Sequence, residues 1–411
     1  MPTPRQRLLL HRVNKINLPR YLLNRAGVEA EGFESHLDWS MGAGSAATNT
    51  TGGQFRTGSA SVKFTSSAVE AFATKTVNIP PGTKGDWSHC RLYYYLHSTL
   101  ADYLSIAIKL ANSDWSKYVT GGREITAKNS KIGWNCWDIY KSDWANTGGL
   151  STADTIARVR FTMASRTGNV VEASLDQLLF DVDSVPAAFI AFDDIRPSVY
   201  DYAYAYMRTK MARATVYAIS GSIDAGGFMT SAQLVTMYGE GWDIGNHSFD
   251  HADLTTLTQG EVEDELTQCQ GTLDGLGLTR ASKHVAYPGG TSSETVRAAM
   301  TATGMLTGRT NDSAYIPNIS ADSSYVLGIW FPANSSTLAQ VKAYVDTAIS
   351  DRKIFGLGFH VLTTGAPAPL EWGSSNFIQL VDYIVNRRIP FVTVSDMYKS
   401  LSSPIEVPLL R

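Results

Sequence analysis

The segment Phe189-Ile190-Ala191-Phe192-Asp193-Asp194 constrains the fold of this chain most strongly. Its apolar run lies between Pro186 and Arg196-Pro197 and has the length of a buried strand in a parallel sheet. The carboxyl ends of such strands are where α/β enzymes hold their catalytic groups. We therefore expect Asp193 and Asp194 to lie at the active edge of a sheet, where one can bind a metal and the other can act as a base.

Residues 186–403 alternate between strand-like and helix-like segments, which predicts a distorted (β/α) barrel or a doubly wound sheet. Further strands are predicted at 214–219, 242–245, 283–287, 326–329, 354–359 and 391–394. Helices are predicted at 231–240, 258–276, 292–303, 337–350 and 376–388. Ser231 is the expected cap of the first helix, and Thr258 with Glu261 forms a capping box for the second.

Residues 29–185 consist of short segments of alternating polarity, separated by Gly, Ser, Thr and Asn. Short strands with polar turns predict an antiparallel β-sandwich. The segments 32–34, 55–64 and 175–182 resemble those of jelly-roll carbohydrate-binding modules. Among the tryptophans of this half we consider five and expect one or two of them to face solvent, where a ring can stack on a sugar: Trp87, Trp115, Trp134, Trp137 and Trp144.

The two ends of the chain flank these domains. Residues 1–28 form a basic arm that contains no acid before Glu29, and residues 404–411 form a short tail. The longest apolar run of the arm is Leu8-Leu9-Leu10, so no signal peptide is visible. We expect the arm to be a solvated or assembly segment, and no stretch of the chain has the length of a membrane span.

Composition excludes several classes of partner and site. The chain has 411 residues, 18% charged residues and a formal net charge of −3, so no basic excess points to nucleic acid. Its three cysteines are Cys90, Cys136 and Cys269, which are too far apart to indicate a disulfide framework or a thiolate metal site. A metal would have to be held by histidine and carboxylate. The oligomeric state does not follow from the sequence.

The segment Asn246-His247-Ser248-Phe249-Asp250-His251 supplies two such histidines after a strand-like run. The spacing of His247 and His251 brings two imidazoles together if the chain turns after the strand. Together with an aspartate they suit Zn²⁺ with open positions for water and substrate. Taken alone, this pattern is more often a pair of unrelated polar histidines.

Four segments together resemble the polysaccharide deacetylases of carbohydrate esterase family four, over about residues 186–401: Ala191–Asp194, Asn246–His251, Ala286-Tyr287-Pro288-Gly289-Gly290 and Leu357–Leu362. The resemblance implies that Asp193 is the general base and His360 the general acid. It also implies that Asp194, His247 and His251 bind a divalent metal, Zn²⁺ or an ion such as Co²⁺, Ni²⁺ or Mn²⁺.

The third segment departs from the commonest pattern of that family. Ala286 stands where many members have an arginine that orients the base, so we expect Asp193 to lack this helper. The resemblance implies that the N–H of Gly289 stabilises the oxyanion and that Tyr287 and Pro288 belong to the same substrate-binding turn. Trp330 is a candidate pocket wall, and core packing is an equal alternative.

The expected function is a metal-dependent hydrolase that removes acetyl groups from an N-acetylated or O-acetylated polysaccharide. Two alternatives stay open: a glycan-binding, adhesion or virion structural protein with an inactive barrel, and a metal-dependent amidase that acts on a small cyclic amide. We expect the protein to act outside the cell or on a cell-surface glycan. It could do so as a component of a bacteriophage virion.

Overall fold

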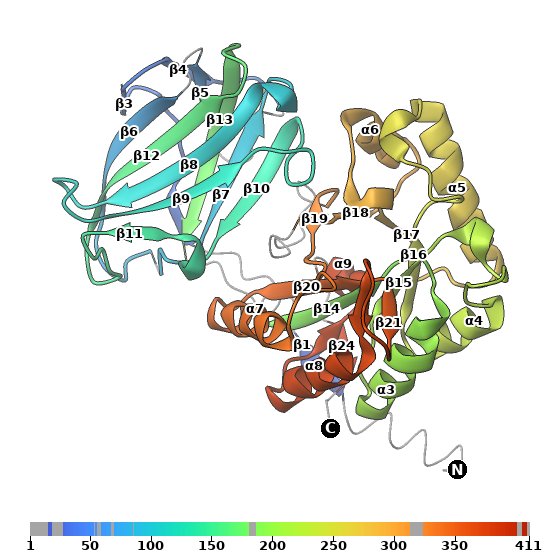
Figure 1. Ribbon diagram of the computed structural model, residues 1–411. Coiled ribbons are helices and arrows are strands. Elements are labelled where there is room, and N and C mark those ends of the chain that lie inside the picture. The colour runs from blue at the N-terminus through green and yellow to red at the C-terminus, as the bar shows by residue number, and fades with distance from the viewer. Residues whose placement is uncertain are drawn as a thin grey trace. The chain divides into compact units, whose positions relative to one another are not determined.

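A computed structural model describes residues 28–400 except 53, 56–58, 67–69, 85, 181–185 and 313–323 (Figure 1). It also describes two short terminal strands, β1 (Lys15–Leu18) and β24 (Ile405–Pro408), which pair antiparallel. The rest of the predicted arm and tail lies outside the described residues. The chain divides into two compact units, one made mainly of Arg25–Asp183 and the other mainly of Ser184–Ile319 and Ser324–Arg411.

Two antiparallel sheets form the first unit, which confirms the predicted β-sandwich. One sheet has the order β10-β7-β13-β5-β4, with β2 paired to β13, and the other has the order β11-β9-β8-β12-β6-β3. The strands of the first sheet are β2 (Val28–Glu31), β4 (Ser45–Asn49), β5 (Ser61–Ser66), β7 (Cys90–Leu96), β10 (Gly133–Ile139) and β13 (Val171–Phe180). Those of the second are β3 (Trp39–Met41), β6 (Ala71–Ile79), β8 (Tyr103–Ala111), β9 (Tyr118–Glu124), β11 (Ala145–Thr147) and β12 (Ile156–Ser165).

Alternation of side chains along the strands explains the core of this unit. On β7, Leu92 and Tyr94 are buried in the same apolar cluster as Ile106 and Ile108 of β8 in the other sheet. Tyr95, one residue further along β7, is only half-buried. Because successive side chains of a strand point to opposite faces, one face of each sheet supplies the core and the other holds polar and aromatic groups.

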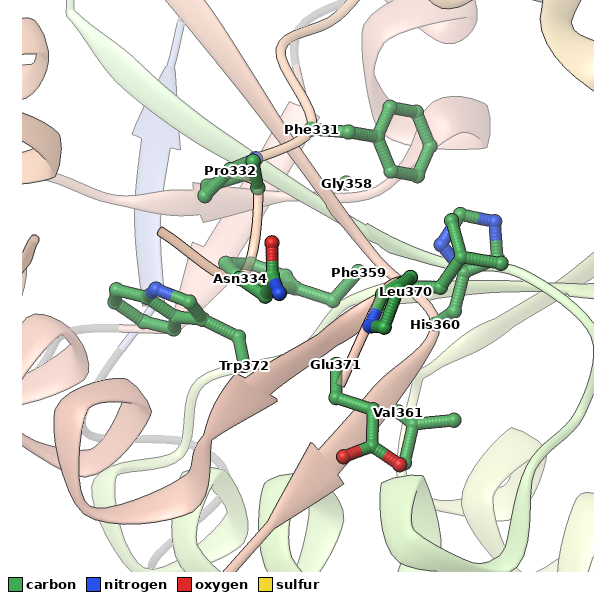
Figure 2. Close-up of a pocket in the computed structure, with 12 residues that line it drawn as sticks. Phe331, Pro332, Asn334, Gly358, Phe359, His360, Val361, Leu370, Glu371 and Trp372 are labelled. Carbon is green, nitrogen blue, oxygen red and sulfur yellow. The ribbon is translucent and has the colours of Figure 1, made fainter. Parts of the chain in front are cut away.

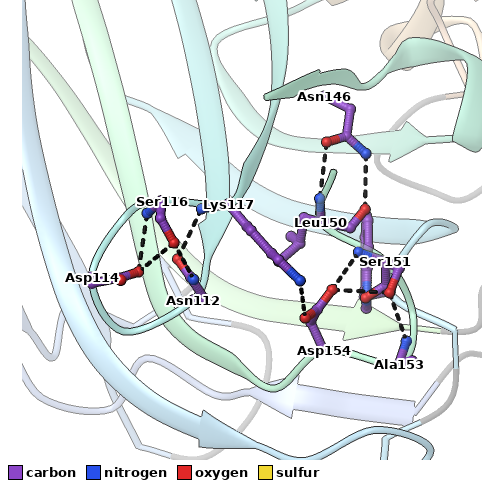
Figure 3. Close-up of polar contacts among 10 residues, drawn as sticks. Asn112, Asp114, Ser116, Lys117, Asn146, Leu150, Ser151, Ala153 and Asp154 are labelled. Carbon is purple, nitrogen blue, oxygen red and sulfur yellow. Dashed lines mark hydrogen bonds and ion pairs between the residues drawn. The ribbon is translucent and has the colours of Figure 1, made fainter. Parts of the chain in front are cut away.

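Polar side chains fix the turns between the strands (Figure 3). Asp114 accepts hydrogen bonds from the N–H and the hydroxyl of Ser116, at 3.1 and 2.7 Å. Asp154 accepts from Lys117 Nζ at 2.8 Å and from the N–H of Ser151 at 2.9 Å. The hydrogen bond from Lys117 is the main reason that the pKa of Asp154 falls to about 2. Asp, Asn and Ser are therefore frequent between the strands because they satisfy turn backbone groups.

The second unit contains a parallel sheet in the order β19-β18-β17-β16-β15-β14-β20, with β23 beside β14 (Figure 1). The strands are β14 (Ala187–Phe192), β15 (Thr215–Ala218), β16 (Asp243–Asn246), β17 (Ala281–Ala286), β18 (Thr307–Thr310), β19 (Leu327–Gly328), β20 (Ile354–Phe359) and β23 (Phe391–Val392). Every residue of β14 is buried, as expected for a strand covered on both faces. The unit is a parallel half-barrel, so the predicted (β/α) architecture is confirmed and the doubly wound alternative is not adopted.

Helices alternate with these strands: α3 (Ala205–Met207), α4 (Ser231–Gly239), α5 (Gln259–Gly275), α6 (Glu294–Ala302), α7 (Leu338–Ser350), α8 (Ser374–Asn386) and α9 (Val394–Lys399). The capping box of Thr258 and Glu261 is confirmed, whereas the cap of α4 is Thr230 and not Ser231. The predicted strand at 391–394 is shorter in the structure because Thr393 caps α9. Thr393 lies just before the helix, and its side chain accepts a hydrogen bond from the N–H of Asp396 in the first turn of α9.

Two short strands, β21 (Val361–Thr363) and β22 (Glu371–Gly373), pair with each other beyond the end of β20. In the part of the chain that the structure describes, none of the helices combines the length and apolar character needed to cross a membrane.

Candidate metal centre

The polar residues singled out in the sequence lie at the carboxyl ends of the parallel strands. Asp193 and Asp194 follow β14, and His360 follows β20, its parallel neighbour. His247 follows β16, and His251 lies four residues further along the same loop. Because parallel strands end at the same edge of a sheet, segments far apart in the sequence meet there. The structure thus brings all five residues together.

Asp194, His247 and His251 form a cluster whose ligand atoms all lie within 4.8 Å of one another. The Nε2 atoms of both histidines are 3.6 Å from Asp194 Oδ1, which is too long for a hydrogen bond. Two ligands of one tetrahedral Zn²⁺, with bonds of about 2.0–2.2 Å, lie roughly 3.4 Å apart. Asp194 Oδ1 is buried and has no hydrogen-bond partner among the described residues, as a ligand atom would.

This donor set therefore fits a divalent ion. Two imidazoles and one carboxylate suit several transition metals, so the residues alone do not select Zn²⁺ over Co²⁺, Ni²⁺ or Mn²⁺. The Nδ1 atom of His247 lies 2.7 Å from the carbonyl oxygen of Ala286. An Nδ1–H that donates to this carbonyl leaves Nε2 unprotonated and facing the cluster. Burial lowers the pKa of His247, so the neutral, ligating form of its imidazole is favoured.

The backbone at two of these ligands is left-handed. Asp194 and His251 both have φ of +67°, and Ser248 between the two histidines has φ of +61°. Non-glycine residues seldom adopt this conformation, and they keep it where the surroundings enforce it. At Asp194 it turns the chain sharply after β14. The two neighbouring carboxylates can therefore face one site although they follow one another in sequence.

Helix α5 holds the loop that carries the two histidines. The carboxylate of Glu265 accepts hydrogen bonds from the N–H groups of Phe249 and Asp250, at 2.9 and 3.1 Å. The hydroxyl of Ser248 accepts from the N–H of His251 at 2.9 Å. These bonds fix the backbone between the two ligands. Glu265 therefore positions the two histidine ligands through the loop and is not itself a member of the ligand cluster.

Asp193 has a different environment from that of Asp194. Its side chain is buried, and both of its oxygens accept from Arg309, at 2.6 and 2.7 Å. Burial alone would raise the pKa of Asp193, but the charges of Arg309, His247 and His360 outweigh burial and lower it. Its Oδ2 lies 3.9 Å from the Nε2 atoms of both His247 and His360. Asp193 is thus an ionised carboxylate beside the cluster, within reach of His360.

Arg309 is the residue of this site that the sequence analysis missed. Since position 286 is alanine, we expected the base to have no arginine partner, and the structure corrects this expectation. Arg309 belongs to β18, where it is aligned with Ala286 of β17. A single arginine inside a short strand-like segment, Thr307-Gly308-Arg309-Thr310, was the available signal. Buried arginines are rare without a partner, so an arginine in a buried strand predicts a carboxylate near it.

His360 lines a cavity of about 310 Å³ (Figure 2). Phe331, Pro332 and Leu370 supply apolar walls, and Phe331 lies with its ring centroid 5.1 Å from that of His360. Leu370, one of these walls, is 66% exposed. The cavity therefore adjoins the side chain expected to act as the acid.

The turn after β17 places its residues in different roles. Pro288 is buried, and Gly289 is exposed with φ of +64°. Among the described residues the N–H of Gly289 has no acceptor within the chain, whereas that of Gly290 donates to Tyr287 O at 2.8 Å. The Gly289 N–H is thus available to an oxyanion. The ring of Tyr287 is fully buried and its hydroxyl donates to Tyr325 O at 3.1 Å, so this side chain supports the fold and faces no substrate.

Trp330, the candidate pocket wall, lies elsewhere. Its ring is 5.0 Å from that of Tyr344 on α7, and it packs against the main core of the unit. The next residue, Phe331, lines the cavity in its place. Side chains alternate along an extended segment, so a shift of one residue changes which face is presented.

Two sequence comparisons match this chain to known proteins. A family model described as "Polysaccharide deacetylase" matches residues 182–308. The "Putative polysaccharide deacetylase YxkH" of Bacillus subtilis (strain 168) is 28% identical over 141 residues, which are 34% of this chain and 50% of that protein. The chain therefore spans about half the length of the curated relative that it matches.

Two solved structures show limited similarity: a family 4 acetyl xylan esterase from Clostridium thermocellum in complex with a cobalt ion, and the peptidoglycan deacetylase PdaC from Bacillus subtilis. Each is 16% identical to this chain and covers 53% of it. The matches take in 93% and 92% of those chains, with TM-scores of 0.38 and 0.39. These TM-scores are low, so the relationship depends on the sequence matches.

Removing one ligand should abolish metal binding. We expect His247→Ala to lose the bound divalent ion, because the two remaining ligands cannot hold it. Elemental analysis of the purified protein measures the change. His97→Ala, in the sandwich, is the matched control and should keep the wild-type stoichiometry. Retention of one equivalent of metal in His247→Ala would show that the ion binds elsewhere.

Loosening the loop should weaken metal binding without removing a ligand. We expect Glu265→Ala to lower metal affinity by about 10- to 100-fold, the usual cost of losing a group that orients ligands. Competition with a chelating dye measures the affinity. Glu263→Ala is the control, because Glu263 is also a half-buried glutamate of α5 but accepts a hydrogen bond from Gln259. Equal affinities in the two folded variants would contradict the positioning role of Glu265.

Proposed function

We propose that this chain, whose C-terminal half contains a polysaccharide deacetylase domain of carbohydrate esterase family four, removes acetyl groups from an N-acetylated or O-acetylated polysaccharide. The observation that carries the proposal is the division between two adjacent aspartates. Asp194 joins His247 and His251 in a metal-ligand cluster, whereas Asp193 is held outside it as an ionised carboxylate. This arrangement supports the proposal of a metal site with a separate base.

The reaction is hydrolysis of an acetyl amide or ester. A divalent ion in the Asp194 cluster supplies Lewis acidity toward water and the acyl oxygen. Asp193 accepts a proton from the attacking water as the water oxygen bonds to the acetyl carbon. The N–H of Gly289 stabilises negative charge on the acyl oxygen. We propose Zn²⁺ as the ion that this cluster binds, with Co²⁺, Ni²⁺ and Mn²⁺ as alternatives.

His360 completes the reaction. The bond from the acetyl carbon to the sugar nitrogen or oxygen breaks, and the leaving group takes a proton from His360, so that acetate and a free amine or hydroxyl result. His360 Nε2 lies 3.9 Å from Asp193 Oδ2, so the proposed acid lies close to the proposed base. The cavity beside His360 has room for part of the substrate, and its apolar walls suit the C–H face of a sugar.

Acetate release tests the function. We expect the purified, metal-loaded protein to release acetate from at least one acetylated polysaccharide, and a chelator followed by added Zn²⁺ to abolish and restore this release. Glycan binding without release under any metal would support the alternative of an inactive binding or structural protein. Turnover of a small cyclic amide alone would support the amidase.

The two aspartates should give opposite results when each is replaced. We expect Asp193→Asn to keep the metal and to lower turnover by about 10²- to 10⁴-fold, the usual contribution of a general base. Acetate release and elemental analysis on the same sample measure both properties. Asp382→Asn, on the surface of α8, should leave both unchanged. Near-normal turnover in Asp193→Asn would exclude it as the base.

We further propose that the β-sandwich binds the polysaccharide. Trp134, Tyr95, Ser174 and Lys63 are aligned across β10, β7, β13 and β5, on the sheet face opposite the core. The rings of Tyr95 and Trp134 are 5.5 Å apart, and both side chains are half-buried. The two neighbouring rings suit stacking on a sugar chain, whereas Ser174 is fully buried and its hydroxyl contacts Asn49 and His97. A polymer held by the same chain as the active site is presented to it at raised effective concentration.

Removing these rings should affect only polymers. We expect Tyr95→Ala with Trp134→Ala to raise KM for long chains by about 2- to 10-fold, the equivalent of about 0.5–1.5 kcal/mol of lost ring contact. Short acetylated oligosaccharides should be hydrolysed as before. Trp115→Ala is the matched control, because Trp115 covers Arg160 of the other sheet. Equal effects on long and short substrates would assign the sandwich to spacing or assembly.

A further inference from the structure

Among the described residues, Arg309 forms its ion pair with the carboxylate of Asp193. It is 1% exposed, and one of its terminal nitrogens donates to both oxygens of Asp193. Its Nε is buried and has no hydrogen-bond partner among the described residues. A buried guanidinium is costly unless it is paired, so its position must be determined by Asp193 and by what surrounds it.

Two aromatic rings hold the guanidinium in place. The central carbon of the Arg309 guanidinium lies 5.1 Å from the ring centroid of Tyr217 and 5.1 Å from that of Phe331. A cation over an aromatic face is attracted by the negative charge of the ring face. Phe331 also packs on His360. One ring therefore contacts both the arginine that pairs with the base and the histidine beside it.

Small residues on neighbouring strands leave room for this arrangement. Ala286 is directly paired with Arg309, and its methyl group lies in the same interior cluster as Tyr217. A Cβ on Gly358 would lie 2.3 Å from the Phe331 ring, so only glycine lets that ring take its place. Figure 2 shows Phe331 beside Gly358 and His360. The small residue Ala286 thus lies beside Arg309, and Gly358 lies beside Phe331.

We propose that Arg309 is the positioning residue that orients Asp193 for catalysis, and that Phe331 fixes Arg309 and His360 relative to each other. This proposal rests on the proposed function, because orientation matters only if Asp193 acts as the base. Nη2 of Arg309 donates to both oxygens of Asp193, and the rings of Tyr217 and Phe331 hold the planar guanidinium that carries this nitrogen, which they would not do for the smaller ammonium of a lysine. Arg309 is buried, and its side-chain hydrogen bonds among the described residues go to Asp193, so its effect passes through Asp193.

The proposal predicts a loss of kcat with little change in KM. We expect Arg309→Lys to lower kcat by about 10- to 100-fold, since a misplaced catalytic group can cost about 100-fold, while metal content stays at the wild-type value. Phe331→Leu should give a smaller loss of the same kind. Arg280→Lys is the matched control, because Arg280 also pairs with an aspartate, Asp243, and lies over a tyrosine ring. It should leave kcat unchanged.

Moving the arginine to the neighbouring strand should rescue the loss. Position 286 faces the same interior, so we expect Ala286→Arg combined with Arg309→Met to have a kcat at least about tenfold above that of Arg309→Met alone, as expected if orientation is restored. A structural role of Arg309 would not produce this rescue. Wild-type kcat in Arg309→Lys, or no rescue in a folded double variant, would overturn the proposal.

A stability measurement keeps the proposal separate from the proposed function. We expect Arg309→Met to lower Tm, because Asp193 is left buried and unpaired, and Asp193→Asn with Arg309→Met to have the higher Tm of the two. Additive Tm changes would show that the two side chains are not coupled and would overturn the proposal in a protein of any activity. Coupled side chains together with no acetate release from any substrate would refute the proposed function alone.

Discussion

The buried ion pair between Arg309 and Asp193 determines what the two adjacent aspartates can do. Both oxygens of Asp193 are held by a guanidinium, and Asp193 is not part of the ligand cluster. Asp194 has only a longer contact with Arg196, 3.6 Å from its Oδ2, and its buried Oδ1 faces two imidazole nitrogens. The same side-chain chemistry can therefore serve, as proposed, as a base at one position and as a ligand at the next.

The parallel sheet creates the place where this division is useful. β14, β16 and β20 end at one edge, so three loops meet although their residues are far apart in the sequence. The left-handed backbone at Asp194 and His251 turns these loops tightly, and Glu265 of α5 stabilises the second of them. Rigid elements behind short, constrained loops are what a metal site with fixed geometry needs.

Much of this could be read from the sequence, for identifiable reasons. The apolar run before Asp193 and the capping box of Thr258 are local patterns, and both appear in the structure as predicted. The role of Arg309 was not accessible in this way, because it depends on which strands lie side by side and on the space left by Ala286. Trp330 shows the same limit, since a one-residue difference in an extended segment decides that Phe331 lines the cavity.

A crystal structure of the protein soaked with Zn²⁺, with anomalous diffraction recorded at the zinc edge, tests the central claim most directly. We predict one anomalous peak at bonding distance from Asp194, His247 and His251, with Asp193 still paired with Arg309 and outside the coordination sphere. An ion bound by Asp193 in place of Asp194, or an Asp193 carboxylate released from Arg309, would contradict the division of roles on which the account depends.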